Sequence, residues 1–268
     1  PEGDAMKVKA NGIQINYRID GPEGAPWLTM SNSLATTHRM WDPQVEAFSR
    51  QYRVLRYDKR GHGETEVAPG PYSFELLADD VLALLDALQI TQTHFVGLSM
   101  GGMTGMTMAL RRPGVLQNLV LCDTTSKDPL GDPALWQQRI DAVNAGGSME
   151  PLVESTVARF LTPDTVKNRP AIADAVRAMV RSTPVAGYVA CCQAIAKLNL
   201  TDRLREITIP TMVVVGADDP ATTVPMARTI HERIAGSELV ILKDAAHLSN
   251  MEQPAAFNEA VLGFLKRH

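Results

Sequence analysis

Apolar residues recur along the chain with two periods, one typical of strands and the other of helices. Short apolar runs predict strands at 27–30, 52–56, 93–97, 119–122, 211–215 and 239–242. Helical spacing of apolar residues predicts helices at 76–88, 101–110, 224–234 and 254–265. Residues 8–19 alternate around Asn11-Gly12, which predicts a β-hairpin. These eight strands, alternating with helices, indicate a mostly parallel sheet with helices on both faces and the hairpin at one edge.

The alternation stops between the strands predicted at 119–122 and 211–215. Residues 133–198 hold only helical patterns, which are divided by Gly146-Gly147, Thr162-Pro163 and Thr183-Pro184. We therefore expect an α/β core made of residues 6–126 and 200–268, with a four-helix cap inserted at 127–199. Residues 1–5 have neither a basic start nor an apolar run, so they are not a signal peptide. We interpret them as an added segment before a natural start at Met6.

The bulk composition excludes several classes of protein. With 268 residues, 45% of them hydrophobic, the chain can form one large α/β domain that carries an insertion. A net charge of −4 without a basic stretch argues against a nucleic-acid partner, and no apolar run is long enough to span a membrane. Cys191 and Cys192 are adjacent, so we interpret them as small apolar side chains on a helix. This cysteine content favours a reducing, cytoplasmic compartment.

The segment Gly97-Leu98-Ser99-Met100-Gly101 matches the pattern G-x-S-x-G and falls between a predicted strand and a predicted helix. In that context the pattern forms the nucleophile elbow of the α/β-hydrolase fold. The sharp turn forces the serine into a strained conformation and exposes its hydroxyl, and only small neighbours tolerate the crowding. The start of the following helix also favours negative charge at this point. Ser99 is therefore the predicted nucleophile.

A serine hydroxyl needs a base to accept its proton, and that base is usually a histidine oriented by a carboxylate. Of the six histidines, His247 is the candidate base because it follows the last predicted strand and precedes the last helix. The strand predicted at 211–215 ends in Gly216-Ala217-Asp218-Asp219, and the chain order serine, aspartate, histidine is that of α/β-hydrolases. We favour Asp219 as the acid because Gly-x-x-Asp is the usual spacing of this fold. Asp218 and Asp123 are the alternatives.

The tetrahedral intermediate of acyl transfer needs two N–H donors for its oxyanion. One belongs to the residue after the nucleophile, Met100, and the other to the loop after the strand predicted at 27–30. That loop reads Ser31-Asn32-Ser33-Leu34-Ala35, so its position makes Leu34 the second donor. Ser33 is a candidate to line the substrate pocket. No His, Cys and Asp residues have metal-ligand spacing, and the mechanism needs no cofactor.

Segments along nearly the whole chain resemble the 3-oxoadipate enol-lactonases. In the core these are Asn32-Ser33-Leu34, Met40-Trp41-Asp42-Pro43-Gln44, Tyr57-Asp58-Lys59-Arg60-Gly61-His62-Gly63, the elbow at 97–103 and Ala246-His247-Leu248. The cap contributes Trp136-x-x-Arg139-Ile140, Gly187-Tyr188 and Cys191-Cys192. Two positions depart from the family: Ala35, where glycine is usual, and Asn199, where an acidic residue is expected. Either residue changes the pocket.

The resemblance implies a cofactor-free hydrolase of aromatic catabolism that opens an enol-lactone to 3-oxoadipate. A lactone of this family carries a free carboxylate, and burying that charge without a partner is costly. Arg139 is the predicted partner because it lies three residues after Trp136, on nearly the same face of a helix. His38 and Arg39, just after the oxyanion loop, are the next candidates.

Other functions fit the same residues. A carboxylesterase or general lactonase with the same triad would take neutral esters or lactones, and a cofactor-free perhydrolase is a further alternative. A dehalogenase would need aspartate in place of Ser99 at the elbow. A ligand-binding receptor on this fold could retain the triad, and a turnover assay would separate it from an enzyme. In each case we expect a small-molecule partner, and the fold alone does not choose among these functions.

Overall fold

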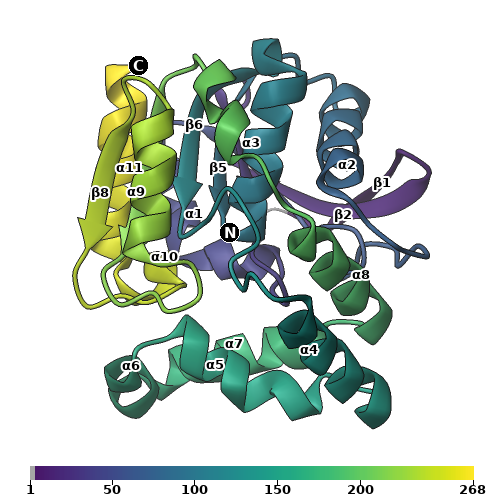
Figure 1. Cartoon of the computed structure of the whole chain (residues 1–268). Coiled ribbons are helices and arrows are strands. Elements are labelled where there is room, and N and C mark those ends of the chain that lie inside the picture. The colour runs from purple at the N-terminus through teal and green to yellow at the C-terminus, as the bar shows by residue number, and fades with distance from the viewer. Residues whose placement is uncertain (1–3) are drawn as a thin grey trace.

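The centre of the molecule is a sheet of eight strands in the order β1-β2-β4-β3-β5-β6-β7-β8 (Figure 1). The computed structural model describes residues 4–268, so most of the segment predicted at 1–5 lies outside the described residues. The pairs β1–β2 and β2–β4 are antiparallel and all other neighbouring pairs are parallel, which confirms the predicted sheet. The strands are β1 (Met6–Ala10), β2 (Ile13–Asp20), β3 (Trp27–Ser31), β4 (Arg53–Tyr57), β5 (Thr93–Leu98), β6 (Leu116–Cys122), β7 (Thr211–Gly216) and β8 (Glu238–Leu242).

The local sequence explains both the edge and the centre of this sheet. Asn11 and Gly12 have φ angles of 49° and 79°, the left-handed pair that a tight type I′ hairpin turn requires. Every residue of β5 and β7 is buried, because elements pack on both faces of the parallel strands. The central strands therefore appear in the sequence as short apolar runs without alternation.

Six helices accompany the core strands. Helix α2 packs on α3, α3 lies against β5, α9 lies against β7 and β8, and α1 packs on α11. Helices α1 and α10 were not predicted, since seven and four residues are too few to show a helical period. None of the helices in the described part of the chain has the length and apolarity that a membrane span requires. The six are α1 (Asp42–Phe48), α2 (Phe74–Ala87), α3 (Met100–Arg111), α9 (Val224–Arg233), α10 (Ser249–Glu252) and α11 (Pro254–Arg267).

The stretch between β6 and β7 forms a helical layer beyond the edge of the sheet to which the arrows of β6 and β8 point (Figure 1). It holds five α-helices where the sequence predicted four, because α6 has six residues and no apolar period. The N–H of Leu200 donates to the carbonyl of Ser126 at 2.7 Å, so the stretch leaves and re-enters the core at adjacent points. These helices are α4 (Pro133–Gly146), α5 (Val153–Phe160), α6 (Pro163–Asn168), α7 (Pro170–Ser182) and α8 (Val185–Ala196).

Two glycines join this layer to the core. Gly187 of α8 lies against the backbone of Gly61, in the loop between β4 and α2. A Cβ on Gly187 would overlap the carbonyl oxygen of Gly61, and a Cβ on Gly61 would lie 2.7 Å from the Cα of Gly187. No other residue type fits at either position unless the two backbones move apart. The contact fixes how closely α8 approaches the core.

Candidate active site

Ser99 lies at the turn between β5 and α3, where the sequence predicted a nucleophile elbow. Its φ of 55° and ψ of −113° lie in a region that residues with a Cβ rarely adopt. Its N–H donates to the carbonyl of Cys122 at 2.8 Å, and the Thr124 hydroxyl donates to the Ser99 carbonyl at 2.7 Å. A Cβ on Gly97 would overlap the backbone of Gly101, which explains the small residues around the serine. These contacts hold the strained turn in place.

His247 and Asp219 meet at the ends of β8 and β7. The ring Nδ1 of His247 lies 2.9 Å from Oδ2 of Asp219. An ionised carboxylate only accepts hydrogen bonds, so Nδ1 carries the proton and Nε2 keeps its lone pair. Asp219 also accepts the N–H groups of Ala221 and Thr222 at 2.9 and 3.0 Å, and the Thr222 hydroxyl at 2.9 Å. These bonds fix the carboxylate that orients the imidazole.

The electrostatics of the site favour the ionised form of Asp219. Burial by itself would raise the pKa of Asp219, but the adjacent His247 ring and the hydrogen bonds outweigh burial and lower that pKa. The imidazole is 2% exposed and lies against the Phe160 ring, with 4.9 Å between the ring centroids. Asp219 is therefore ionised at neutral pH, and its hydrogen bond fixes the ring orientation of His247.

The two alternative acids lie elsewhere. Asp218 is exposed. Asp123 is fully buried at the end of β6, where it accepts the Gly216 N–H at 2.8 Å and the Ser249 hydroxyl at 2.5 Å. Burial, together with the nearby charge of Asp219, holds the pKa of Asp123 well above its usual range. Of the three aspartates only Asp219 hydrogen-bonds to the His247 ring.

Leu34 and Met100 are the residues whose N–H groups the sequence predicted as oxyanion donors. Met100 is the first residue of α3, so its N–H has no acceptor within the helix. Leu34 and Ala35 line the same cavity as Ser99. Ala35 has a φ of 60°, a conformation that glycine adopts without strain. That angle explains why glycine suits this position and why alanine is an unusual choice.

Ser99 and His247 open into one cavity of about 300 Å³. A larger groove of about 650 Å³ lies between α4 and α8, but neither Ser99 nor His247 reaches it. Of these two spaces, the smaller cavity is thus the one that can hold a small molecule against Ser99. Its remaining walls come from the loop after β3, α3, the helical layer, the loop after β7 and α9: Leu34, Ala35, Met103, Pro129, Leu130, Trp136, Arg139, Thr156, Arg159, Phe160, Tyr188, Ile195, Pro220, Ala221, Thr222, Thr223 and Met226.

Two guanidinium groups from the helical layer line this cavity. Arg139 of α4 was predicted from the sequence, and its guanidinium lies 5.2 Å from the ring centroid of Trp136. Arg159 of α5 was not predicted, and its hydrogen-bond partner is the Thr156 hydroxyl at 3.4 Å. Burial and the charge of Arg139 lower the pKa of Arg159 to about 10, so it remains a cation at neutral pH. Within residues 4–268 no carboxylate pairs with either guanidinium.

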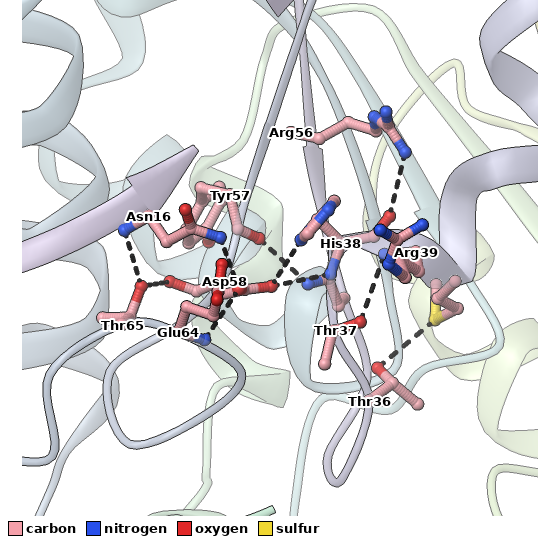
Figure 2. Close-up of polar contacts among 12 residues, drawn as sticks. Asn16, Thr36, Thr37, His38, Arg39, Arg56, Tyr57, Asp58, Glu64 and Thr65 are labelled. Carbon is pink, nitrogen blue, oxygen red and sulfur yellow. Dashed lines mark hydrogen bonds and ion pairs between the residues drawn. The ribbon is translucent and has the colours of Figure 1, made fainter. Parts of the chain in front are cut away.

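Two predicted pocket residues, Ser33 and His38, are not among the described residues that line this cavity. Figure 2 shows His38 turned toward Asp58, whose Oδ1 lies 3.0 Å from the ring Nδ1 and 2.8 Å from the His38 N–H. The Asn16 side chain and the Glu64 N–H donate to the other oxygen. Burial would raise the pKa of Asp58, but these contacts, led by His38, lower it to about 2. His38 thus belongs to a buried network beside the cavity.

The family model for the alpha/beta hydrolase fold matches residues 26–254. The chain belongs to the α/β-hydrolase family. It is 38% identical over 260 residues to 3-oxoadipate enol-lactonase 2 of Acinetobacter baylyi, which covers 97% of this chain and 96% of the relative. This α/β-hydrolase is therefore an enzyme, a hydrolase that resembles the enol-lactonases.

Solved structures agree with that assignment. The enol-lactonase from Burkholderia xenovorans LB400 is 39% identical, with a TM-score of 0.94 over 97% of this α/β-hydrolase and 100% of that chain. A thermophilic esterase from Thermogutta terrifontis is 28% identical, with a TM-score of 0.90 over 98% of both chains. The resemblance therefore covers the helical layer as well as the sheet.

Proposed function

We propose that this α/β-hydrolase opens the ring of a lactone that carries a free carboxylate, of the enol-lactone type. The observation that carries the proposal is the pair of cations Arg139 and Arg159, which line the cavity of Ser99 without a carboxylate partner among the described residues. Two like charges side by side repel each other, and an anion bound between them turns that repulsion into attraction. The names of the enol-lactonase relatives support the same substrate class.

In the proposed reaction the Ser99 hydroxyl attacks the lactone carbonyl while Nε2 of His247 takes its proton. Asp219 keeps the proton on Nδ1 and stabilises the imidazolium that forms. The N–H groups of Leu34 and Met100 stabilise the oxyanion of the tetrahedral intermediate. Collapse of that intermediate breaks the ring C–O bond, the His247 imidazolium gives its proton to the leaving ring oxygen, and an acyl-enzyme remains on Ser99.

The nature of the leaving group decides whether the ring stays open. An alkoxide leaving group remains tethered to the acyl chain and can close the ring again. An enol leaving group tautomerises to a ketone, which removes the internal nucleophile. His247 then takes a proton from water, and the hydroxide equivalent attacks the acyl carbonyl and releases the carboxylic acid and Ser99.

The second candidate function is hydrolysis of neutral esters. Much of the cavity wall is apolar, with Met103, Leu130, Ile195 and Met226 among its residues, and such a wall would accept an uncharged acyl group. The thermophilic esterase among the solved structures supports this alternative. The two proposals differ in what the arginines do, since a neutral ester has no charge for them to bind.

A matched substrate pair separates the two proposals. We would measure kcat/KM for an enol-lactone that carries a free carboxylate, for its methyl ester and for p-nitrophenyl acetate. Loss of a charged hydrogen bond costs about 2 kcal/mol, so the acid form should exceed its methyl ester at least about thirtyfold. Equal values for acid and methyl ester would favour the esterase. If none of the three substrates were turned over, the result would favour a ligand-binding receptor over an enzyme.

A further inference from the structure

The loop between β4 and α2 holds the oxyanion loop at two consecutive peptide units. The Lys59 ammonium donates to the Ser33 carbonyl at 2.6 Å, and the Thr36 hydroxyl donates to the same oxygen at 2.8 Å. One residue further along, the Ala35 N–H donates to Nε2 of His62 at 3.0 Å. The residue between these two anchors is Leu34, whose N–H is the second oxyanion donor of the proposed mechanism.

The hydrogen bond from Lys59 to the Ser33 carbonyl also fixes the direction of the Leu34 N–H. The carbonyl of Ser33 and the N–H of Leu34 belong to one planar peptide unit, in which the two groups point in opposite directions. Because Lys59 binds that carbonyl from the core side, the Leu34 N–H points away from Lys59. Leu34 lines the cavity and Lys59 does not, so that direction is toward the cavity of Ser99. The second anchor prevents the following peptide unit from turning.

The charges of the two residues reinforce each other. Lys59 is 5% exposed, and no carboxylate within the described residues forms an ion pair with its ammonium. Burial, and then the charge of Lys59, hold the pKa of His62 well below its usual value, so the imidazole is neutral. A neutral ring can accept the Ala35 N–H at Nε2, whereas an imidazolium cannot. The cation also polarises the Ser33–Leu34 peptide, which strengthens its N–H as a donor.

We propose that Lys59 and His62 are positioning residues that set the direction and strength of the Leu34 oxyanion donor. They touch no substrate and act through the backbone of Ser33, Leu34 and Ala35. This inference rests on the proposed function, since it assumes that Leu34 stabilises an oxyanion.

A dependence on pH follows from the burial of Lys59. Burial lowers the pKa of its ammonium to about 8, although Cys191 of α8 and Asp58 oppose the shift. The neutral amine above that pH is a weaker donor to the Ser33 carbonyl. The groups that face Lys59 do not titrate there, because the pKa of the buried Cys191 thiol is raised to about 12 and that of Asp58 is lowered to about 2. The neighbouring Arg60 keeps its charge, because its hydrogen bonds to Asp80, 2.8 Å away, raise the pKa of the guanidinium.

The test follows kcat/KM for p-nitrophenyl acetate from pH 6 to 10 in the wild type, Lys59→Met and the control Lys7→Met, whose lysine is exposed on β1. In the wild type, kcat/KM should fall about fivefold as the pH rises through about 8, the difference between a charged and a neutral donor. Lys59→Met should lower kcat/KM at pH 7 at least about tenfold and remove the alkaline fall. Its kcat should fall with KM changed less than about twofold, since the interaction forms in the transition state. Lys7→Met should follow the wild-type curve.

Three outcomes would overturn the inference. The first is a wild-type profile that stays flat to pH 10, a result that does not depend on whether the variant folds. The second is a Lys59→Met enzyme that keeps the alkaline fall, and the third is one that loses activity only through KM. Failure of the proposed function gives a different result, because a wild type that turns over neither the carboxylate lactone, nor its methyl ester, nor p-nitrophenyl acetate would show no Ser99 catalysis at any pH.

Discussion

The sharpest prediction concerns Arg159, the cation that the sequence did not reveal. Arg159→Met removes the guanidinium while keeping much of the apolar stem. Two unit charges 4 Å apart attract by about 4 kcal/mol at an effective dielectric constant of 20, and a single charged hydrogen bond contributes about 1.5–3 kcal/mol. Arg159 is half-buried and shares the anion with Arg139, so we expect a loss of about 2 kcal/mol, or about thirtyfold in kcat/KM for the carboxylate-bearing lactone.

The same change should not weaken the fold. Arg139 lowers the pKa of Arg159 through like-charge repulsion, and removing one of the two cations relieves that repulsion in the free enzyme. The melting temperature of Arg159→Met should therefore equal or exceed that of the wild type. Such a result is expected when a residue contributes to binding but lowers the stability of the fold.

The assay compares the carboxylate lactone with p-nitrophenyl acetate in three variants. Arg159→Met and Arg139→Met should each lose activity on the lactone and keep it on the neutral ester. Arg181→Met is the matched control, because Arg181 lies exposed on α7 and pairs with Glu150 at 3.0 Å. Equal losses on both substrates, or a lowered melting temperature, would show that Arg159 supports α5 and binds no substrate. No loss on either substrate would refute the carboxylate site.

The remaining predictions concern the triad and its surroundings. Ser99→Ala should lower kcat about a millionfold in a folded protein, and more than a few per cent of residual activity would disprove the nucleophile. Asp219→Asn should lower kcat about ten-thousandfold, because His247 would be held in the wrong tautomer. Asp218→Asn should leave kcat nearly unchanged, since Asp218 is exposed, and the reverse result would make Asp218 the catalytic acid. Asp123→Asn should move the acid limb of the pH profile by less than about one pH unit, because burial and the charge of Asp219 already raise the pKa of the native carboxyl, and a larger shift would contradict that direction. Dialysis against a strong chelator should leave the rate unchanged, and a loss that added metal restores would contradict the mechanism.

The sequence predicted the sheet because buried parallel strands leave a simple pattern. Strands such as β5 and β7 are buried along their whole length and consist mostly of apolar residues after a polar first position, and each is bounded by glycine or a polar loop. The elbow was equally visible, since Gly97, Ser99 and Gly101 combine a steric requirement with a fixed spacing. Among the acids, the spacing after Gly216 favoured the aspartate that lies 2.9 Å from the imidazole.

The substrate side of the cavity was harder to predict because it depends on how distant segments meet. Arg159 ends a short amphipathic helix and looks in the sequence like a solvated charge, and only the docking of α5 over the core brings it to Ser99. His38 follows the oxyanion loop directly, yet the 3-10 turn at His38–Trp41 directs its ring to Asp58. A side chain's neighbours in the chain do not determine the direction in which it points.

The attachment of the helical layer bears on how the enzyme could have diversified. The layer is joined to the sheet through chain ends that meet at Ser126 and Leu200, so a longer or shorter insertion would leave the distance between β6 and β7 unchanged. Selection could then exchange the part that carries Arg139 and Arg159 while the core segments that carry Ser99, Asp219 and His247 were inherited intact. The constraint on such an exchange is the contact with Gly61, to which any replacement helix would have to present a residue as small as Gly187.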